Sequence, residues 1–428
     1  MLYTPLKFSS SFLIASIAYF FLGPVSYSIG NISTMLLCLL FYLCMSHIGY
    51  LLGVYFSLRV KADKKSHLFK ISFWNVVLFA IFSNLIFNYV VAAQSFIPHN
   101  VISFFKYLLS GDIVGLGNLY YDSKMNSEGG KSLIMSVLFS AIGWGRFIFI
   151  PYVIWNWTTL NPTRKVISVL VALMPVLTGV SIGLNKPLFD TVLVFFLFAG
   201  IGCLLCSGQG NRDNFLRFRK LVKVSSFSVL LAIILFGNAM NSRGVTFDYI
   251  EANSPRGDIS VSDRVPENSL SISLIMLGHY MFQGYYAFSL SLEQSFDSTY
   301  GFGHSPFLAR QYNRLMGDDI SDRTYQQKID GEWANETRWH SAYSQFANDV
   351  HFVGVGFVIL IIYFVMALTW VFATKYRMRE FLYFLPVHGI LVIFLPANNQ
   401  VFGFADSLGL VFIMAALIVY RLVSRYKV

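Results

Sequence analysis

The sequence predicts an all-α polytopic membrane protein with about ten transmembrane helices. Of its 428 residues, 55% are hydrophobic and only 13% are charged, and the mean hydropathy is +0.58. Apolar runs also recur along the chain at lengths of about 17 to 25 residues, which a helix needs to cross roughly 30 Å of hydrocarbon. This composition excludes a soluble globular domain.

Ten apolar runs separated by polar breaks are the candidate spans. They are 8–29, 34–58, 71–93, 132–154, 166–184, 188–206, 224–240, 350–373, 381–395 and 401–420. The chain therefore divides into residues 1–240 with seven spans, a long polar segment at 241–349, and residues 350–428 with three spans. The first run has no small-residue cleavage site after it, so we expect an uncleaved first span.

The basic residues are distributed asymmetrically about these spans. Nineteen of the 32 Lys and Arg residues fall on one side of a ten-span topology, where three acidic residues oppose them and the net charge is +16. The positive-inside rule makes this the cytoplasmic side, with both termini on it. Because the charges follow the topology, the overall charge of +10 predicts no nucleic-acid partner.

The other side receives a loop at 94–131 and the long segment at 241–349, which holds eight basic and fourteen acidic residues. Within the long segment, residues 270–292 are apolar enough to suggest an eleventh span. An additional crossing would reverse the sidedness of every basic loop that follows. We therefore predict an interfacial or re-entrant helix at 270–292.

Neither a metal nor a cofactor is indicated by any motif. The four cysteines all lie inside apolar runs, and the CxxC spacing of Cys203 and Cys206 falls within a span, where ordinary packing explains it. No HExxH motif and no GxxxxGK[ST] motif occurs, so ATP-driven transport by this chain alone is not expected.

Three cations are candidates for contacts with a charged substrate. Arg146 lies inside the fourth candidate span, where an arginine costs about 3 kcal/mol or more. It is a candidate substrate contact, and the alternatives are that it snorkels to the interface or pairs with a carboxylate such as Asp190 or Asp406. Lys186 lies on a tight outer turn, and Arg243 opens the long segment beside a glycine. Either cation suits a lipid pyrophosphate at the headgroup level.

The end of the long segment gives the strongest local signal, Trp339-His340-Ser341-Ala342-Tyr343 continuing to Asp349. His340 is a candidate general base near neutral pH, and Asp349 is a candidate catalytic carboxylate. Arg338, Trp339 and Tyr343 are candidate substrate contacts, because aromatic rings stack on sugars. The alternative for each is an ordinary structural role.

Helix geometry restricts how this motif works. At about 100° per residue, His340 and Asp349 would lie on nearly opposite faces of one helix. Two arrangements remain open. Either a non-helical turn places His340 outside the helix, or His351 is the nearer companion of His340.

The arrangement resembles the Wzy-type O-antigen or oligosaccharide repeat-unit polymerases, relatives of the O-antigen ligases. The layout is similar along the whole chain, with about ten spans and one large periplasmic loop before the last spans. At the residue level, the resemblance consists of Lys186 in Gly-Leu-Asn-Lys, Arg243 in Asn-Ser-Arg-Gly, and the stretch from His340 through Asp349 to Gly354. The first of these positions is more often arginine in the family, so Lys186 departs from the pattern.

The resemblance implies a glycosyltransferase of the bacterial inner membrane that needs no nucleotide-sugar donor. A growing glycan on undecaprenyl pyrophosphate would be transferred to one lipid-linked repeat unit at the periplasmic face. His340 would then be the base, and Arg243 and Lys186 would bind the leaving pyrophosphate. The implied partners are the lipid-linked oligosaccharide, membrane lipid and a chain-length regulator protein.

Three other functions are compatible with the sequence. A flippase or exporter of lipid-linked oligosaccharide would share the basic lipid contacts but would not need the long outer segment. An O-antigen ligase would share the segment, the cations and the histidine, and would differ in its acceptor. A structural or receptor-like membrane protein would use the same loops without chemistry.

Overall fold

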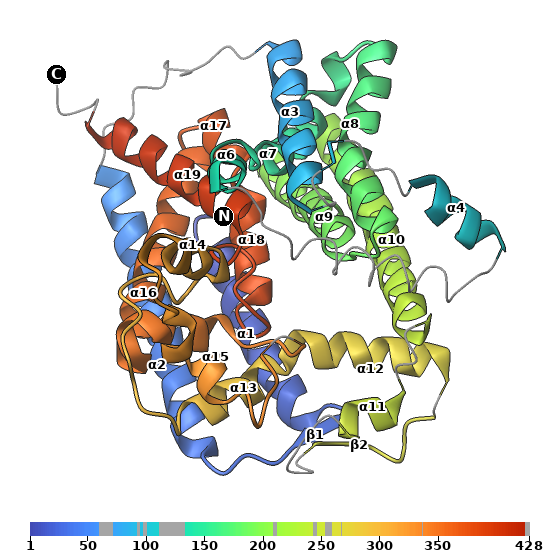
Figure 1. Ribbon diagram of the computed structural model, residues 1–428. Coiled ribbons are helices and arrows are strands. Elements are labelled where there is room, and N and C mark those ends of the chain that lie inside the picture. Colours follow the sequence, from blue (N-terminus) through green and yellow to red (C-terminus); the bar gives the residue numbers. More distant parts are fainter. Residues whose placement is uncertain are drawn as a thin grey trace.

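Figure 1 shows the computed structural model of the chain, in which 77% of the described residues are helical. It describes residues 1–59, 72–91, 95–96, 101–110, 133–208, 212–242, 246–252, 259–266, 268–335 and 337–423. In these residues, nine helices are long and apolar enough to cross a membrane, so the chain is a multi-pass membrane protein. Arg243 and most of the loop at 94–131 lie outside the described residues.

The nine helices match nine of the ten predicted runs. They are α1 (Thr4–Leu22), α2 (Ile32–Arg59), α3 (Phe73–Val91), the α6–α7 run (Leu133–Thr159), α8 (Pro162–Ser181), α9 (Lys186–Ser207), the main part of α10 (Arg212–Gly237), α16 (Ala342–Thr374) and α19 (Ala405–Val423). The α6–α7 run comprises α6 (Leu133–Ile142), α7 (Gly145–Asn156) and the 3₁₀ turn η1 (Trp157–Thr159), whereas α10 continues to Ser242.

The tenth predicted run forms two short helices, α17 (Arg379–Leu382) and α18 (Leu385–Phe394). Pro386 has no N–H to donate to the carbonyl of Leu382, at which α17 ends, so the two helices cannot join there. Ten residues of helix cover only about 15 Å. The stretch is nevertheless joined to α16 near both of its ends, because Met378 N donates to Phe372 O (3.0 Å) and Ala342 N donates to Leu395 O (3.0 Å).

One end of the bundle, here called the basic end, gathers the N-terminus and several basic segments. The contacts that place them together are Trp370 Nε1 to Met1 O (3.0 Å), Tyr376 OH to Ser57 O (3.0 Å) and the ion pair between Arg421 and Glu380. The predicted grouping of basic segments on one side therefore agrees with the contacts in the described part of the chain.

The opposite end, here called the outer end, carries the long polar segment. Strand β1 (Val25–Tyr27) pairs antiparallel with β2 (Ile259–Val261) of that segment, with Val25 opposite Val261. Further contacts there are Tyr27 OH to His279 Nδ1 (2.7 Å) and Asn31 Nδ2 to Ser289 O (2.8 Å). No pattern in the sequence indicated this small sheet.

The predicted interfacial or re-entrant helix at 270–292 consists of α12 (Ser269–Phe282) and α13 (Gly284–Ser291). With 14 and 8 residues, neither is long enough to cross a membrane. In Figure 1, α12 lies across the lower end of α10 rather than alongside it. A Cβ atom at Gly284 would lie 2.2 Å from the carbonyl oxygen of Pro396, so only glycine allows this approach to the turn before α19.

Short helices fill the rest of the polar parts. They are α4 (Val101–Ser110), α11 (Phe247–Ala252), α14 (Pro306–Met316), the 3₁₀ turn η2 (Ile320–Arg323) and α15 (Tyr325–Lys328). α14 begins after the N-cap Ser305, whose side chain accepts a hydrogen bond from Leu308 N. Phe307 of α14 packs with buried residues of α3, α6 and α19, which fixes α14 to the bundle.

α16 bends at His351, whose backbone has φ 59° and ψ 164°. The bend lies one residue after Val350, the predicted start of the eighth span. The nine residues of α16 before His351 therefore belong to the outer end, and the rest of the helix enters the bundle. Asp349 lies two residues before this bend.

Candidate functional site

Asp349 organises the loop at 299–304. Its Oδ1 accepts hydrogen bonds from Thr299 Oγ1 and from the backbone N–H groups of Gly301 and Gly303, both at 3.0 Å. Its Oδ2 accepts from His304 N at 3.1 Å and lies 2.7 Å from His304 Nδ1. Both carboxylate oxygens are therefore fully used, and the imidazole of His304 is held in one orientation.

The pairing also fixes how His304 carries its proton. A carboxylate only accepts hydrogen bonds, so Nδ1 bears the proton and Nε2 of the neutral ring keeps a free lone pair. The His304 side chain is 20% exposed, whereas that of Asp349 is 9% exposed. An oriented, accessible imidazole backed by a buried carboxylate is the arrangement of a general base.

Sequence reasoning missed His304. It lies 45 residues before Asp349 and outside the motif that begins at Trp339. The available signal was the run Gly301-Phe302-Gly303-His304-Ser305-Pro306, in which two glycines precede a histidine directly before a helix N-cap. Glycines at such positions allow a backbone to wrap closely around a side chain.

A second group of polar side chains lies inside the bundle. Arg146 of α7 donates from Nε to Asp406 of α19 at 2.8 Å, and its Nη2 lies 3.4 Å from Asp190 of α9. Lys186 Nζ lies 2.7 Å from the same Asp190 oxygen. Of the alternatives predicted for Arg146, pairing with a carboxylate is confirmed, and it involves both Asp190 and Asp406.

This cluster contains two cations and two carboxylates, so its formal charge is zero. Balanced charges are what a low-dielectric bundle requires. The Arg146 side chain is only 6% exposed, whereas that of Lys186 is 27% exposed. Lys186 is therefore the member of the cluster that a ligand reaches most easily.

The turn at 399–404, directly before α19, connects the two groups. Asn399 Nδ2 donates to His304 O (2.9 Å), and the ring of Phe402 lies 6.3 Å from the His304 ring. Lys186 Nζ lies 4.4 Å from the ring centroid of Phe404. Because Phe402 and Phe404 are two residues apart, their α-carbons are separated by about 7 Å at most. The oriented histidine and the accessible lysine thus flank one short turn, which we call the candidate site.

His340 lies outside this candidate site. It precedes the N-cap Ser341 of α16, so the first of the two predicted arrangements, a non-helical position, is confirmed. Its side chain is buried, and neither ring nitrogen has a hydrogen-bond partner among the described residues. Burial lowers the pKa of His340 to about 3, so the imidazole is neutral near pH 7.

Asp349 pairs with His304 rather than with His340. His351 does not take that place either, since its side chain is exposed and its ring lies 5.4 Å from that of Phe296. The nearest companion of Asp349 is thus a residue that the motif did not contain.

The remaining predicted substrate residues are engaged in protein contacts. Arg338 Nη1 lies 2.9 Å from His279 Nε2, and burial together with Arg338 lowers the pKa of His279 to about 3. The Trp339 ring packs 5.0 Å from that of Tyr280. Tyr343 is buried, with its ring stacked 5.1 Å from that of Tyr42. These side chains form the core beneath the outer segment.

Potential metal ligands do not gather in the described part of the chain, where no group of three or more His, Cys, Asp and Glu side chains is placed to hold a metal ion.

Comparisons with known proteins give no relative. No family model matches the chain, and no curated protein or solved structure matches it significantly. A functional assignment therefore rests on the residues and on the geometry above.

Proposed function

We propose that this chain is a glycosyltransferase that polymerises undecaprenyl-pyrophosphate-linked oligosaccharide repeat units. The product would be O-antigen or a similar surface polysaccharide, made at the periplasmic face of the bacterial inner membrane. The observation that carries the proposal is the His304–Asp349 pair, a partly exposed and oriented imidazole at the outer end of a membrane bundle. The accessible Lys186 on the other side of the turn at 399–404 adds a cation.

The proposed reaction uses these groups in one substitution. His304 Nε2 takes the proton from an acceptor hydroxyl on one lipid-linked repeat unit. The hydroxyl oxygen bonds to the anomeric carbon of the growing glycan as the bond from that carbon to the pyrophosphate oxygen breaks. Asp349 stabilises the imidazolium that forms, and Lys186 stabilises the departing undecaprenyl pyrophosphate.

In this proposal His304 takes the role that the sequence motif suggested for His340. A general base must reach its proton within a hydrogen-bond distance. His304 is accessible and oriented, whereas the His340 side chain is buried and its pKa is lowered to about 3. Arg243 stays a candidate pyrophosphate ligand, and Arg146 is assigned to holding Asp190 in place.

The first test is an electrophoretic profile of lipopolysaccharide from cells that lack this gene. Loss of the polymerase leaves a core with a single repeat unit and no ladder. Complete loss of attached repeats, with lipid-linked polymer accumulating, would instead identify a ligase. Repeat units retained on the cytoplasmic face would identify a flippase.

A further inference from the structure

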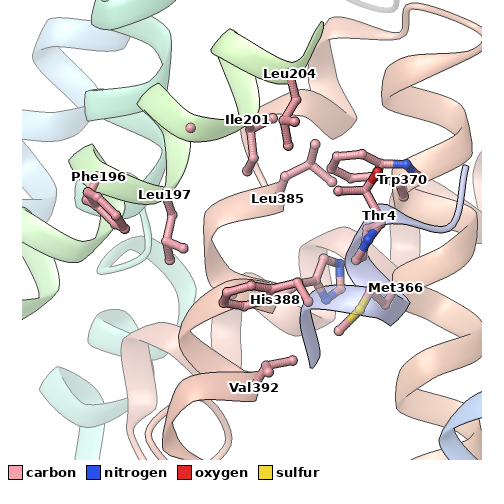
Figure 2. Close-up of a pocket in the computed structure, with 14 residues that line it drawn as sticks. Thr4, Phe196, Leu197, Ile201, Leu204, Met366, Trp370, Leu385, His388 and Val392 are labelled. Atoms are coloured by element: carbon pink, nitrogen blue, oxygen red, sulfur yellow. The ribbon is translucent and has the colours of Figure 1, made fainter. Parts of the chain in front are cut away.

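A cavity of about 230 Å³ lies between α1, α9, α16 and α18, and none of its lining residues belongs to the candidate site. Figure 2 shows its apolar walls, which include Leu197 and Ile201 of α9, Met366 and Trp370 of α16, and Leu385 of α18. Apolar cavities of about 150 Å³ already bind a molecule as large as benzene. This cavity is therefore large enough for part of a hydrocarbon chain.

The cavity belongs to the basic end of the bundle. Thr4, Pro5 and Phe8, at the start of α1, line it. Trp370, another lining residue, donates from Nε1 to Met1 O at 3.0 Å. A ligand there would come from the membrane leaflet opposite to the one that faces the His304–Asp349 pair.

One polar side chain that lines this apolar cavity has a ring nitrogen without a hydrogen-bond partner among the described residues. His388 of α18 lines the cavity (Figure 2), its side chain is buried, and its Nε2 has no hydrogen-bond partner among the described residues. A buried nitrogen without a partner is unfavourable in an apolar setting. A ligand that combines a hydrocarbon chain with a hydrogen-bonding group would satisfy both the walls and His388.

The basic residues near the cavity indicate that the ligand carries a negative charge. Lys7 is exposed on α1, one turn from Thr4 and next to Phe8. The end of α2, at Arg59, and the basic segment that begins at Lys375 lie at the same end of the bundle. Clustered basic residues at a membrane surface attract anionic lipids.

We infer that this cavity binds one acyl chain of an anionic phospholipid. The chain lies against α9 and α16, His388 hydrogen-bonds to an ester group of the lipid, and Lys7 faces the phosphate. The site is separate from the proposed catalytic site and would hold a structural or regulatory lipid. It does not depend on the reaction proposed above.

The test is photolabelling of the full chain in phosphatidylcholine nanodiscs that contain phosphatidylglycerol with a photoreactive acyl chain. Peptide mapping is expected to place the label at 196–204 and 385–392. Gly200→Leu is expected to reduce it strongly, because a Cβ at Gly200 has no atom within 4 Å and the leucine would fill the cavity. Gly331→Leu, at another glycine with open space around it, is the control and is expected to label normally.

Two further variants test the polar contacts. Lys7→Gln should weaken labelling by the phosphatidylglycerol probe about fivefold, as expected for one basic residue near a charged surface. His388→Leu should also weaken it while the apolar walls are preserved. Label spread over the exposed face of α8 and unaffected by Gly200→Leu would overturn the inference, as would equal labelling by a photoreactive phosphatidylcholine.

Discussion

Replacing Asp349 by asparagine tests the His304–Asp349 pair directly. The asparagine keeps one oxygen, which continues to accept from Thr299, Gly301 and Gly303. Its amide group would then face His304 N and Nδ1, which are both donors in the native arrangement. The variant therefore loses two hydrogen bonds to a charged group and no longer favours the tautomer with a free Nε2.

The two effects have separate magnitudes. Each hydrogen bond to a buried charge contributes about 1.5 to 3 kcal/mol, so losing two lowers the free energy of unfolding by about 3 to 6 kcal/mol. Loss of the oriented base should reduce the rate by about 10² to 10⁴. The rate measurement is polymer formation from purified lipid-linked repeat units in proteoliposomes, corrected for the folded fraction.

Thr299→Val provides the matched control. It removes a hydrogen bond at the other oxygen of Asp349 and leaves the contact to His304 in place. We expect a stability loss of about 1 to 3 kcal/mol and a nearly normal rate per folded molecule. A normal rate for Asp349→Asn, or an equal rate loss for both variants, would refute the assignment of His304 as an oriented base.

Three other predictions concern the charged and buried groups. His340 and His279 each have a folded-state pKa of about 3, below the usual value of 6.5, so their contribution to stability is complete above pH 6.5 and is lost as pH falls. We expect each histidine to lower the free energy of unfolding by about 2 kcal/mol at pH 5, relative to neutral pH. His340→Leu should therefore reduce the slope of melting temperature against pH, and an unchanged slope would contradict the burial of His340. Arg146→Ala should destabilise the protein by about 3 to 5 kcal/mol in thermal unfolding, because it leaves Asp190 and Asp406 buried without the guanidinium. Lys186→Ala should lower the rate of polymer formation per folded molecule, with only a small change in melting temperature. A large fall in melting temperature with a normal rate per folded molecule would assign Lys186 a structural role only.

Much of the bundle could be predicted because its causes are local. Span length follows from hydrocarbon thickness, and sidedness follows from the positions of Lys and Arg, so nine helices and the gathering of basic segments agreed with the sequence. The partners of Arg146 were also predictable, since a buried charge needs an opposite charge and few carboxylates lie within spans. The tenth run was predicted as one span because it is strongly apolar, but Pro386 divides it into two short helices.

The candidate site depended on contacts that no local pattern encodes. His304 and Asp349 are 45 residues apart, and their pairing requires the loop at 299–304 to fold against α16. The stretch around His340 had the composition of a catalytic motif, but the His340 side chain is buried in the folded chain. Spacing along one helix separates His340 from Asp349 only if that helix begins before His340, and spacing could not identify His304 as the partner of Asp349.

The pairing of β1 with β2 has a consequence for biosynthesis. Tyr27 leaves the ribosome 232 residues before its partner Ile259. At about 5 to 20 residues per second, β1 waits roughly 10 to 50 s for β2. During that time the first two helices are in the membrane while a short strand edge between them is unpaired. The outer segment therefore completes its fold only when β2 pairs with β1, a strand that is synthesised early but acquires its partner late.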